Sequence, residues 1–381
     1  MKILRIIDSM SPAIGGPSEG IRNIIPEMAK HSITNEVVCF DGPLEPFIKE
    51  STFKIHALGK GYSKWSYNKL FENWLEKNYT NYNLIIIHGL WLYQTYAVYR
   101  LLSKIENKNL SQKFFGMPHG MLDPYFQYAK TRKLKAIRNY IYWHLIESKY
   151  IKSLDGVLFT SDIELQNARK TFSNYHPKKE IMCSYGINDL SNTTIKNEKG
   201  NYLLFLGRID SKKGIDLIIK AYDKLVISSS NALPQLIIAG SIHDKEYFKY
   251  CNEIVSKNKK LKDKISFRNF VQGEEKKELI NNCMALILPS HQENFGISVA
   301  EALSFGKPVL ISNKVNIHKI ILRENCGFVE ENSVEGCIKL ITSFVTLTPR
   351  QMNEMNLNAI HAFKRNFSIE NYCQNLIKLL N

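Results

Sequence analysis

The sequence lacks several patterns that mark whole classes of protein. Its seven cysteines are scattered without a CxxC pair, so a disulfide framework is not indicated and a cytosolic protein with reduced thiols is expected. The longest apolar runs, such as LIIIHGLWLY (84–93), are far shorter than the roughly twenty residues of a membrane span. The opening MKILRIIDSM leads directly into a Gly-Pro loop, which predicts a first strand and not a signal peptide.

Two nucleotide-binding signatures are also missing. The first loop after a predicted strand contains Gly15-Gly16 but no GxGxxG, which argues against a Rossmann dinucleotide site, and GxxxxGK[ST] of the Walker A loop is absent. Acidic residues are few beside basic ones, 36 against 51, giving a net charge of +15. This excess favours an anionic partner: nucleic acid, lipid head groups or a phosphorylated substrate. The alternative is a lysine-rich, solvated surface. No nucleic-acid-binding motif is visible.

What the chain does have is alternation of short apolar runs with longer amphipathic segments. Runs that are apolar almost throughout and end in Gly, Pro or Ser are typical of strands covered on both faces. We predict such strands at 2–8, 35–40, 53–58, 83–89, 113–118, 156–161 and 180–185, and again at 202–207, 235–240, 265–270, 285–290, 308–312 and 327–331. Strands that alternate with helices indicate βαβ units and parallel sheets.

The fold class is therefore α/β, with two Rossmann-like, doubly wound domains facing a central cleft. At 381 residues the chain is too long for one ordinary core. We expect an N-terminal domain at 1–185, a polar linker at 186–201 and a C-terminal domain at 202–365. The last segment, 366–381, is expected to form a helix that packs back toward the N-terminal domain.

Ligands of open parallel sheets bind beyond the carboxyl ends of the strands, which directs attention to the residues that follow each run. In the first half, Gly15 and Gly16 precede a helix start and suit a phosphate, although a plain strand-to-helix turn explains them equally well. His119 in PHGMLD follows the fifth run and could bind a sugar hydroxyl or stabilise charge, although a structural histidine is the commoner case. His88 occupies an equivalent place.

The second half offers more specific candidates. Arg208 and Lys213 in GRIDSKKG lie between a strand and a helix, where two cations can hold a diphosphate; ordinary surface cations are the alternative. In HQENFGISVAEALSFGKP (291–308), Glu293 lies in a loop and Glu301 one turn into a helix. The backbone N–H groups of the helix start, at Phe295, Gly296 and Ile297, suit an anionic or hydroxyl-rich ligand. Because Glu301 has small apolar neighbours, it needs a polar partner, for which a ribose diol is suited.

Residues 202–331 resemble the family 4 retaining glycosyltransferases of the GT-B fold. The matched pieces are FLGRIDSKKGID, LIIAGS, LILPSHQENFGISVAEALSFGKPVL and CGFVEE, and the most specific is the E-x7-E motif at Glu293 and Glu301. The N-terminal half matches more loosely, through GGP, IIHGLW, PHGMLDP and TSDIE, and looks like the acceptor domains of enzymes that build bacterial surface polysaccharides such as O-antigen, capsule or exopolysaccharide.

The resemblance implies a role for each matched residue. Arg208 and Lys213 would hold the diphosphate of a nucleoside-diphosphate sugar, and Gly16 would approach the phosphates from the other domain. Glu301 would bind the ribose, while Glu293 and the backbone at 295–297 would bind the sugar. His119 would lie beside the reacting carbon.

The resemblance also implies the chemistry. The sugar would move to a hydroxyl of a glycan acceptor with retention of configuration. No metal or other cofactor is expected, because cations and a helix dipole would neutralise the leaving diphosphate, and a DxD-type carboxylate pair is absent.

The sequence departs from the family pattern at two places. These departures leave open which nucleotide base the protein binds and what geometry the hinge between its two domains has. The usual PNGVD segment is SYGIND here, with Tyr185 before Gly186, and the usual glycine of FxGxV is Asn269.

A basic segment, 128–152, carries Lys130, Arg132 and Lys133, followed by aromatic residues that include Trp143. Cations followed by aromatics of this kind can dock on an anionic membrane. Such docking would suit an acceptor carried on a polyprenyl diphosphate lipid. The protein would then lie peripherally on the inner face of the cell membrane. The alternative is that the aromatics pack on the sheet and the cations are solvated.

Two further classes compete. A nucleotide-sugar 2-epimerase uses the same two-domain frame but needs neither a second sugar nor membrane contact. A non-enzymatic nucleic-acid binder would explain the charge but not the paired glutamates, so no nucleic-acid partner is expected.

Overall fold

The computed structural model describes residues 1–12, 16–105, 111–128, 133–190, 200–228 and 233–378. The chain forms two compact units. Unit 1 comprises Met1–Gly186 and Ile369–Asn381, and unit 2 comprises Ile187–Ser368. Each unit contains one parallel sheet, and each is described below by itself.

Unit 1 is built on a seven-stranded sheet in the order β3-β2-β1-β4-β5-β6-β7. All pairs are parallel. The strands are β1 (Lys2–Ile6), β2 (Thr34–Cys39), β3 (Ile55–Ala57), β4 (Leu84–His88), β5 (Lys113–Met117), β6 (Gly156–Phe159) and β7 (Glu180–Met182). All seven runs predicted in the first half form strands. Every residue of the central strand β4 is buried, which is why its sequence is apolar without alternation.

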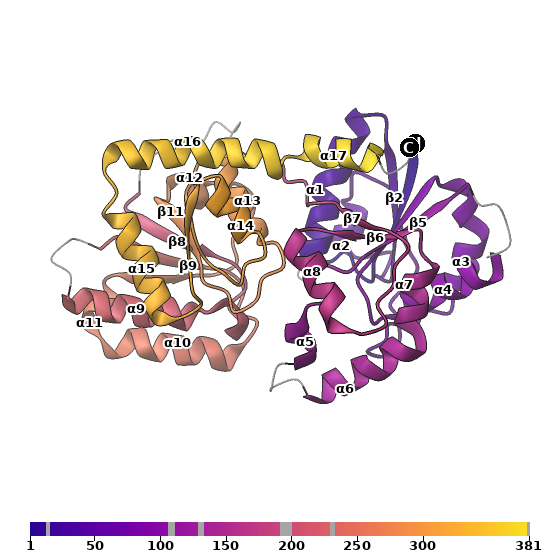
Figure 1. Cartoon of the computed structure of the whole chain (residues 1–381), viewed down its shortest axis with the longest axis horizontal. Helices are drawn as coiled ribbons and strands as arrows, with labels where there is room; N and C mark the ends of the chain where they lie inside the picture. Colours follow the sequence, from indigo (N-terminus) through magenta and orange to yellow (C-terminus); the bar gives the residue numbers. More distant parts are fainter. Residues whose placement is uncertain (13–15, 106–110, 129–132, 191–199, 229–232, 379–381) are drawn as a thin grey trace. The chain divides into compact units, whose positions relative to one another are not determined.

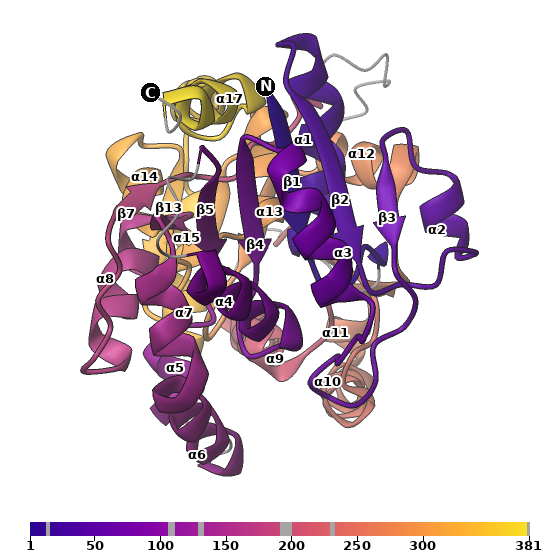
Figure 2. The ribbon, with the colours of Figure 1, turned by 90° about the vertical axis from the view of Figure 1, so that its right-hand side faces the viewer.

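The helices of unit 1 lie on both faces of this sheet. They are α1 (Gly16–Lys30), α2 (Pro46–Lys49), α3 (Phe71–Asn78), α4 (Tyr93–Ile105), α5 (Pro124–Tyr128), α6 (Lys133–Tyr142), α7 (Ser148–Ser153), α8 (Asp162–Thr171) and α17 (Ile369–Lys378), with a π-helical turn at Trp143–Glu147 and a 3-10 turn at Tyr79–Asn81. The connection from β1 to β2 and the connection from β4 to β5 run in opposite directions across the sheet. Because both crossovers are right-handed, they place α1 and α4 on opposite faces. Helices α3, α4 and α7 form the layer nearest the viewer in Figure 2.

Unit 2 has a six-stranded parallel sheet in the order β10-β9-β8-β11-β12-β13. The strands are β8 (Tyr202–Leu206), β9 (Gln235–Ala239), β10 (Ile265–Arg268), β11 (Ala285–Leu288), β12 (Val309–Ser312) and β13 (Gly327–Glu330). Each corresponds to a predicted run, so the prediction of two doubly wound sheets is confirmed. The order reverses between β8 and β11, and at such a switch point the loops after neighbouring strands diverge and leave room for a ligand.

Two groups of helices cover the sheet of unit 2, as Figure 1 shows. One group contains α9 (Ile215–Ser228), α10 (Lys245–Lys257), α11 (Lys259–Lys262) and α15 (Val334–Val345), and the other contains α12 (Gly273–Asn282), α13 (Ile297–Ser304), α14 (His318–Arg323) and α16 (Pro349–Asn366). Helix α16 is 18 residues long and begins at a capping box formed by Thr348 and Gln351. It was not predicted from the sequence.

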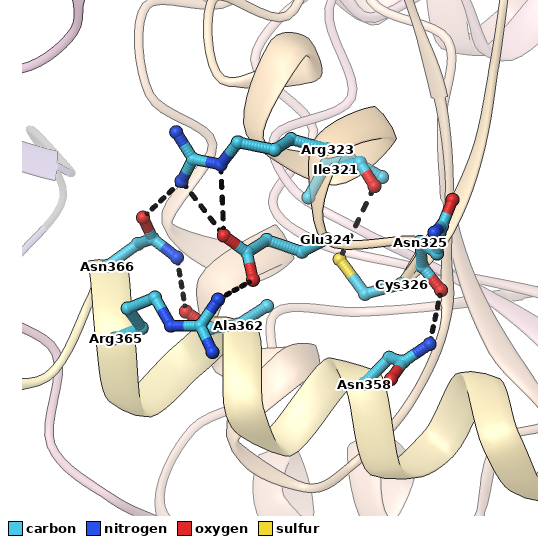
Figure 3. A network of polar contacts seen from close by, with 9 residues as sticks. All are labelled: Ile321, Arg323, Glu324, Asn325, Cys326, Asn358, Ala362, Arg365 and Asn366. Carbon is cyan, nitrogen blue, oxygen red and sulfur yellow. Dashed lines mark hydrogen bonds and ion pairs between the residues drawn. The ribbon is translucent and has the colours of Figure 1, made fainter.

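A polar network fastens α16 to the turn between α14 and β13 (Figure 3). The buried carboxylate of Glu324 accepts from Arg323 at 3.0 Å and from Arg365 of α16 at 2.7 Å. Asn358 donates to the Asn325 carbonyl oxygen at 3.2 Å. Since α13 packs on α16, this network supports the helix that carries Glu301.

Within unit 1, α17 contacts α1, and the hydroxyl of its Tyr372 lies 3.3 Å from a guanidinium nitrogen of Arg5 in β1. The chain's last described helix therefore helps to enclose the first strand. None of the helices that the structure describes is both long and apolar enough to cross a membrane.

Candidate functional site

The candidate site of unit 2 begins where the loops after β8 and β11 meet. The N–H of His291 donates to the Lys212 carbonyl oxygen at 2.7 Å. Gly214 ends the first loop with φ of 64°, and a Cβ atom there would lie 2.4 Å from the Pro289 carbonyl oxygen. The two loops are thus in backbone contact, and only glycine permits this approach.

The contact brings together Lys213 and Glu293, which are eighty residues apart and form a hydrogen-bonded ion pair. Their side chains are 15% and 18% exposed. Burial opposes ionisation of Glu293, but Lys213, Lys212 and Arg208 outweigh it and hold the pKa of the carboxyl group below its usual value. The structure therefore gathers Arg208, Lys213 and Glu293, as the sequence analysis expected from their places after strands.

The backbone of Glu293 is held from the neighbouring strand. Its N–H donates to the Lys314 carbonyl oxygen at 3.1 Å, and its own carbonyl oxygen accepts from the N–H of Asn316 at 3.0 Å. Both partners follow β12. Two hydrogen bonds hold the backbone of Glu293, and Lys213 holds its carboxylate. This residue therefore has little freedom to reorient, which suits a group that must hold a ligand in one position.

Helix α13 starts directly after this loop. Gly296 caps it with φ of 78°, and Ile297 is its first residue. The side chain of Phe295 is buried and meets the Phe367 ring edge-on at 5.6 Å. The predicted ligand-binding role of Phe295, Gly296 and Ile297 therefore falls to their backbone N–H groups. These groups lie at the start of a helix, where N–H groups lack intrahelical partners.

Glu301 lies buried in α13, but its partner is one that sequence reasoning missed. Lys276 of α12 donates to a Glu301 carboxylate oxygen at 2.6 Å. The expectation that Glu301 needs a polar partner is correct, and a lysine supplies it in this structure. Lys276 sits in the run EEKKE, whose charges give no sign of which lysine turns inward.

His119 of unit 1 is partly buried and belongs to a chain of hydrogen-bonded polar groups. Its Nε2 atom lies 2.9 Å from Nδ1 of His88, and its Nδ1 atom is hydrogen-bonded to the hydroxyl of Tyr185. Burial lowers the pKa of His119 to about 3, with a smaller contribution from Arg5, so the imidazole is neutral at pH 7. Both ring nitrogens are thus engaged, which the sequence could not indicate.

The turn that presents His119 is tied to the next strand. Glu164 of α8, a residue of the TSDIE segment, accepts from the N–H of Gly120 at 2.5 Å and from the N–H of Thr160 at 2.7 Å. His119 itself has φ of 54°, which is unusual for a residue with a side chain. One buried carboxylate therefore fixes two strand-end loops relative to each other.

The remaining predicted residues have mixed outcomes. Gly16 is the first residue of α1, as expected of a glycine at a helix start. Gly15, Lys130 and Arg132 lie outside the described residues. Lys133 is exposed at the start of α6.

The prediction that Trp143 contacts a membrane or acceptor is wrong. Its side chain is fully buried, stacks on Phe172 with ring centroids 4.3 Å apart, and donates to Asn174. The indole is directed inward because that face of the helix packs on the unit's core, and in this respect the alternative of aromatics packed inside was right.

Residues 187–361 match the model of the family described as glycosyl transferases group 1. The chain is 33% identical over 126 residues to the uncharacterized glycosyltransferase MJ1607 of Methanocaldococcus jannaschii, an alignment that covers 33% of this chain and 30% of that protein. It is 29% identical over 181 residues to the O-antigen chain mannosyltransferase RfbU of Salmonella typhimurium, covering 48% of each.

Alignments with these and the other curated relatives cover between 30% and 55% of the relatives' own lengths. The fold agrees over the whole chain: the structure of Anabaena Alr3699/HepE in complex with UDP-glucose matches with a TM-score of 0.74 and 15% identity, covering 100% of this chain and 99% of that one. The GT-B fold expected from the sequence is thereby confirmed. The segment that matches the family model contains Arg208, Lys213, Glu293 and Glu301.

Proposed function

We propose that this protein is a retaining glycosyltransferase that moves a hexose from a nucleoside-diphosphate sugar to a hydroxyl of a glycan acceptor. The observation that carries the proposal is the pairing of Glu293 with Lys213 at the switch point of the unit 2 sheet. The family match and the names of the relatives support the same activity.

Each residue of the unit 2 site has a task suited to its chemistry. Arg208 and Lys213 offer positive charge to the diphosphate, the first through a planar fork and the second as a point charge. Glu293 accepts hydrogen bonds from sugar hydroxyls, and the start of α13 offers N–H groups. Glu301 accepts from the ribose hydroxyls. Donor binding then places the two carboxylates at two ends of one ligand.

The reaction needs charge stabilisation more than a protein nucleophile. When the bond between the sugar and the diphosphate breaks, negative charge grows on the leaving phosphate, and the cations beside Glu293 stabilise it. In this proposal the leaving phosphate takes the proton of the acceptor hydroxyl, which attacks from the same face and so retains the configuration. Glu293 orients the sugar without forming a covalent bond to it.

The test incubates the full chain with UDP- and GDP-sugars and a glycan acceptor, and measures released nucleoside diphosphate and the anomeric configuration of the product. Glu293→Gln should reduce turnover on the order of 100-fold while the melting temperature changes little. Glu335→Gln is the matched control, since Glu335 is also paired with a lysine, Lys224 at 3.0 Å, but on an exposed surface. Equal turnover by the Glu293 and Glu335 variants would overturn the role of Glu293.

The same experiment separates the competing classes. A 2-epimerase would release nucleoside diphosphate or invert a sugar centre without an acceptor. A nucleic-acid binder would gain thermal stability from a short oligonucleotide and none from UDP or GDP. Stabilisation by one nucleoside diphosphate, with acceptor-dependent turnover, is the result that supports the transferase.

For the acceptor, we propose a polyprenyl-diphosphate-linked glycan reached at an anionic membrane surface, in bacterial surface polysaccharide synthesis such as that of O-antigen. The support is an apolar stripe along α6 and the π-helical turn, formed by Leu134, Ile137, Ile141 and Leu145, which are 85%, 58%, 54% and 62% exposed. Exposed cations on α6 accompany it: Lys133, Lys135 and Arg138. Apolar side chains beside cations suit a surface of acyl chains and anionic head groups.

Sedimentation with vesicles of phosphatidylglycerol and phosphatidylcholine tests this surface. We expect Ile137→Ser with Ile141→Ser to weaken binding about tenfold, and neutralising Lys133, Lys135 and Arg138 to remove its dependence on salt. Ile227→Ser is the control, because Ile227 is 74% exposed in unit 2. If both sets of α6 variants bind vesicles as well as the wild type, the proposal that this surface binds a membrane is refuted. The proposed transfer reaction would not be affected by that result.

A further inference from the structure

Asn332 lies in the loop between β13 and α15, and its side chain holds three consecutive residues of another loop. The amide nitrogen donates to the Pro289 carbonyl oxygen at 2.7 Å and to the Ser290 carbonyl oxygen at 3.1 Å. The amide oxygen is hydrogen-bonded to Nδ1 of His291. These three residues directly follow β11 and begin the loop that carries Glu293. Both polar atoms of one side chain are therefore bonded to the start of the loop that forms the candidate site.

The three contacts leave a single orientation for the Asn332 amide. Only its NH₂ group can donate to carbonyl oxygens, so the nitrogen faces Pro289 and Ser290, and the oxygen faces His291. An amide oxygen only accepts, so Nδ1 of His291 carries a proton in the neutral ring as well as in the charged one. The contact thus fixes the tautomer of a neutral His291, which gives this arrangement a spectroscopic signature.

Local secondary structure does not account for the Asn332 side chain. The helix that follows, α15, is capped by Ser333, whose side chain accepts from the N–H of Gly336 at 2.9 Å. Strand β13 is at the edge of the sheet and pairs with β12, which separates it from β11. Backbone pairing therefore does not join β13 to β11, whereas the Asn332 side chain joins the loops that follow them.

The residues that Asn332 holds also meet the loop after β8. The Pro289 carbonyl oxygen, which accepts from Asn332, lies against Gly214, where a Cβ atom would be 2.4 Å away. Lys213 directly precedes this glycine. A shift of the Pro289 carbonyl group would therefore change where Lys213 lies relative to Glu293.

We propose that Asn332 is a positioning residue of the unit 2 site, which holds the start of the loop after β11 in place so that Glu293 meets Lys213 before a ligand binds. A site that is arranged in advance loses less free energy when its groups are ordered around a ligand or a transition state. The assignment of that ligand as a nucleoside-diphosphate sugar rests on the proposed function. The placing of Glu293 by Asn332 does not.

The contact with His291 can be measured without a ligand. Imidazole ¹⁵N chemical shifts of the full chain labelled at histidine distinguish a protonated ring nitrogen from a bare one, and His291→Gln identifies the signals of His291. We expect Nδ1 of His291 to be protonated at pH 7 and to lose this preference in Asn332→Ala. A bare Nδ1 in the wild type would overturn the proposal, whether or not any variant folds.

The placing of Glu293 is measured by the pKa of its carboxyl group, which the neighbouring cations hold below its usual value. Carboxyl ¹³C chemical shifts of the full chain follow this titration, and Glu293→Gln identifies the signal. In Asn332→Ala the pKa of Glu293 should rise toward its usual value, because the cations no longer surround the carboxylate. An unchanged pKa of Glu293 in folded Asn332→Ala would refute the role of Asn332.

Turnover with a sugar donor and a glycan acceptor gives the functional readout. Asn332→Ala should lower kcat about tenfold and raise KM for the donor less than about threefold, since a displaced carboxylate matters most in the transition state. Asn258→Ala is the matched control. Asn258, also in unit 2, donates to Asp223 at 2.7 Å and accepts from the N–H of Lys260 at 3.0 Å, so its loss affects stability but should leave kcat unchanged. Equal kcat values for the two variants would contradict a positioning role.

Asn332→Asp separates the two kinds of contact. It keeps an oxygen that accepts from His291 but removes the NH₂ group that donates to Pro289 and Ser290. We expect His291 to keep its Nδ1 proton while kcat falls as in Asn332→Ala, and full turnover by Asn332→Asp would overturn the role of the two carbonyl contacts. If the wild type transfers sugar from no donor while the spectrum and the titration agree with expectation, the proposed function fails and the placing of Glu293 by Asn332 stands.

Discussion

The two units hold different kinds of polar groups within and after the strands of their sheets. In unit 2, Glu293 and Glu301 are each paired with a lysine, so the site is charged but locally balanced. In unit 1, His88 and His119 are neutral and the one buried cation, Arg5, has no carboxylate beside it among the described residues. A balanced site can exchange its lysine partners for a ligand.

The largest effect should follow from removing one of the two opposite charges in the Lys213–Glu293 pair of unit 2. Lys213→Met leaves Glu293 mostly buried beside fewer cations, so its pKa should rise and turnover should fall about 100-fold or more. The free energy of unfolding should drop by about 2–4 kcal/mol, since one partner of a mostly buried pair is removed.

The double variant Lys213→Met with Glu293→Gln should recover most of that stability but none of the turnover, as measured by thermal melts and product release. Lys319→Met, at an exposed lysine of α14, serves as the control. If Lys213→Met melts at the same temperature as the wild type, the ion pair contributes nothing to the stability of the fold. The charge of Glu293 would then not depend on Lys213 for its balance.

A smaller effect should follow at the second pair. Glu301→Gln keeps the shape of the side chain but weakens its hydrogen bonds to ribose hydroxyls, so Kd for the nucleoside diphosphate should rise about tenfold. Titration calorimetry with UDP and GDP measures this. Lys276→Met tests whether the lysine competes with the ribose: tighter binding would show competition, and weaker binding would show that Lys276 itself holds the ligand.

The smallest effect concerns the charged cluster of unit 1, where Glu36 accepts from His56 and Tyr82 at 2.7 Å and pairs with Lys2 at 2.8 Å. Burial opposes ionisation, but these partners lower the pKa of Glu36 to about 2. A lowered folded-state pKa contributes stability that is complete above the unfolded value near 4.5 and is lost as pH falls toward 2.

Glu36→Gln should therefore lower the melting temperature by a few degrees at pH 7, and the difference from the wild type should shrink between pH 4.5 and 2. Melts at a series of pH values measure this. A difference that stays constant down to pH 2 would mean that the carboxylate charge contributes nothing to stability.

Much of this organisation was predictable. The strands that the structure describes coincide with the predicted runs. A central strand such as β4 is buried along its whole length and is therefore apolar almost throughout, whereas the edge strands β3 and β13 are half-buried. Arg208, Lys213, Glu293 and His119 were singled out by their places after those strands. The partners of Glu301 and His88 were not predicted, because Lys276 and Arg5 carry no local signal of the contacts they make.

The sequence by itself determined two parallel α/β sheets and which polar residues follow their strands, because burial and helix periodicity are local patterns of residue type. Only the tertiary structure decided which lysine meets which glutamate, that Trp143 turns inward, and that Tyr372 reaches Arg5 across 367 positions of the chain. Those outcomes depend on how side chains from distant elements share one buried space, and packing of this kind is fixed only when the whole unit closes.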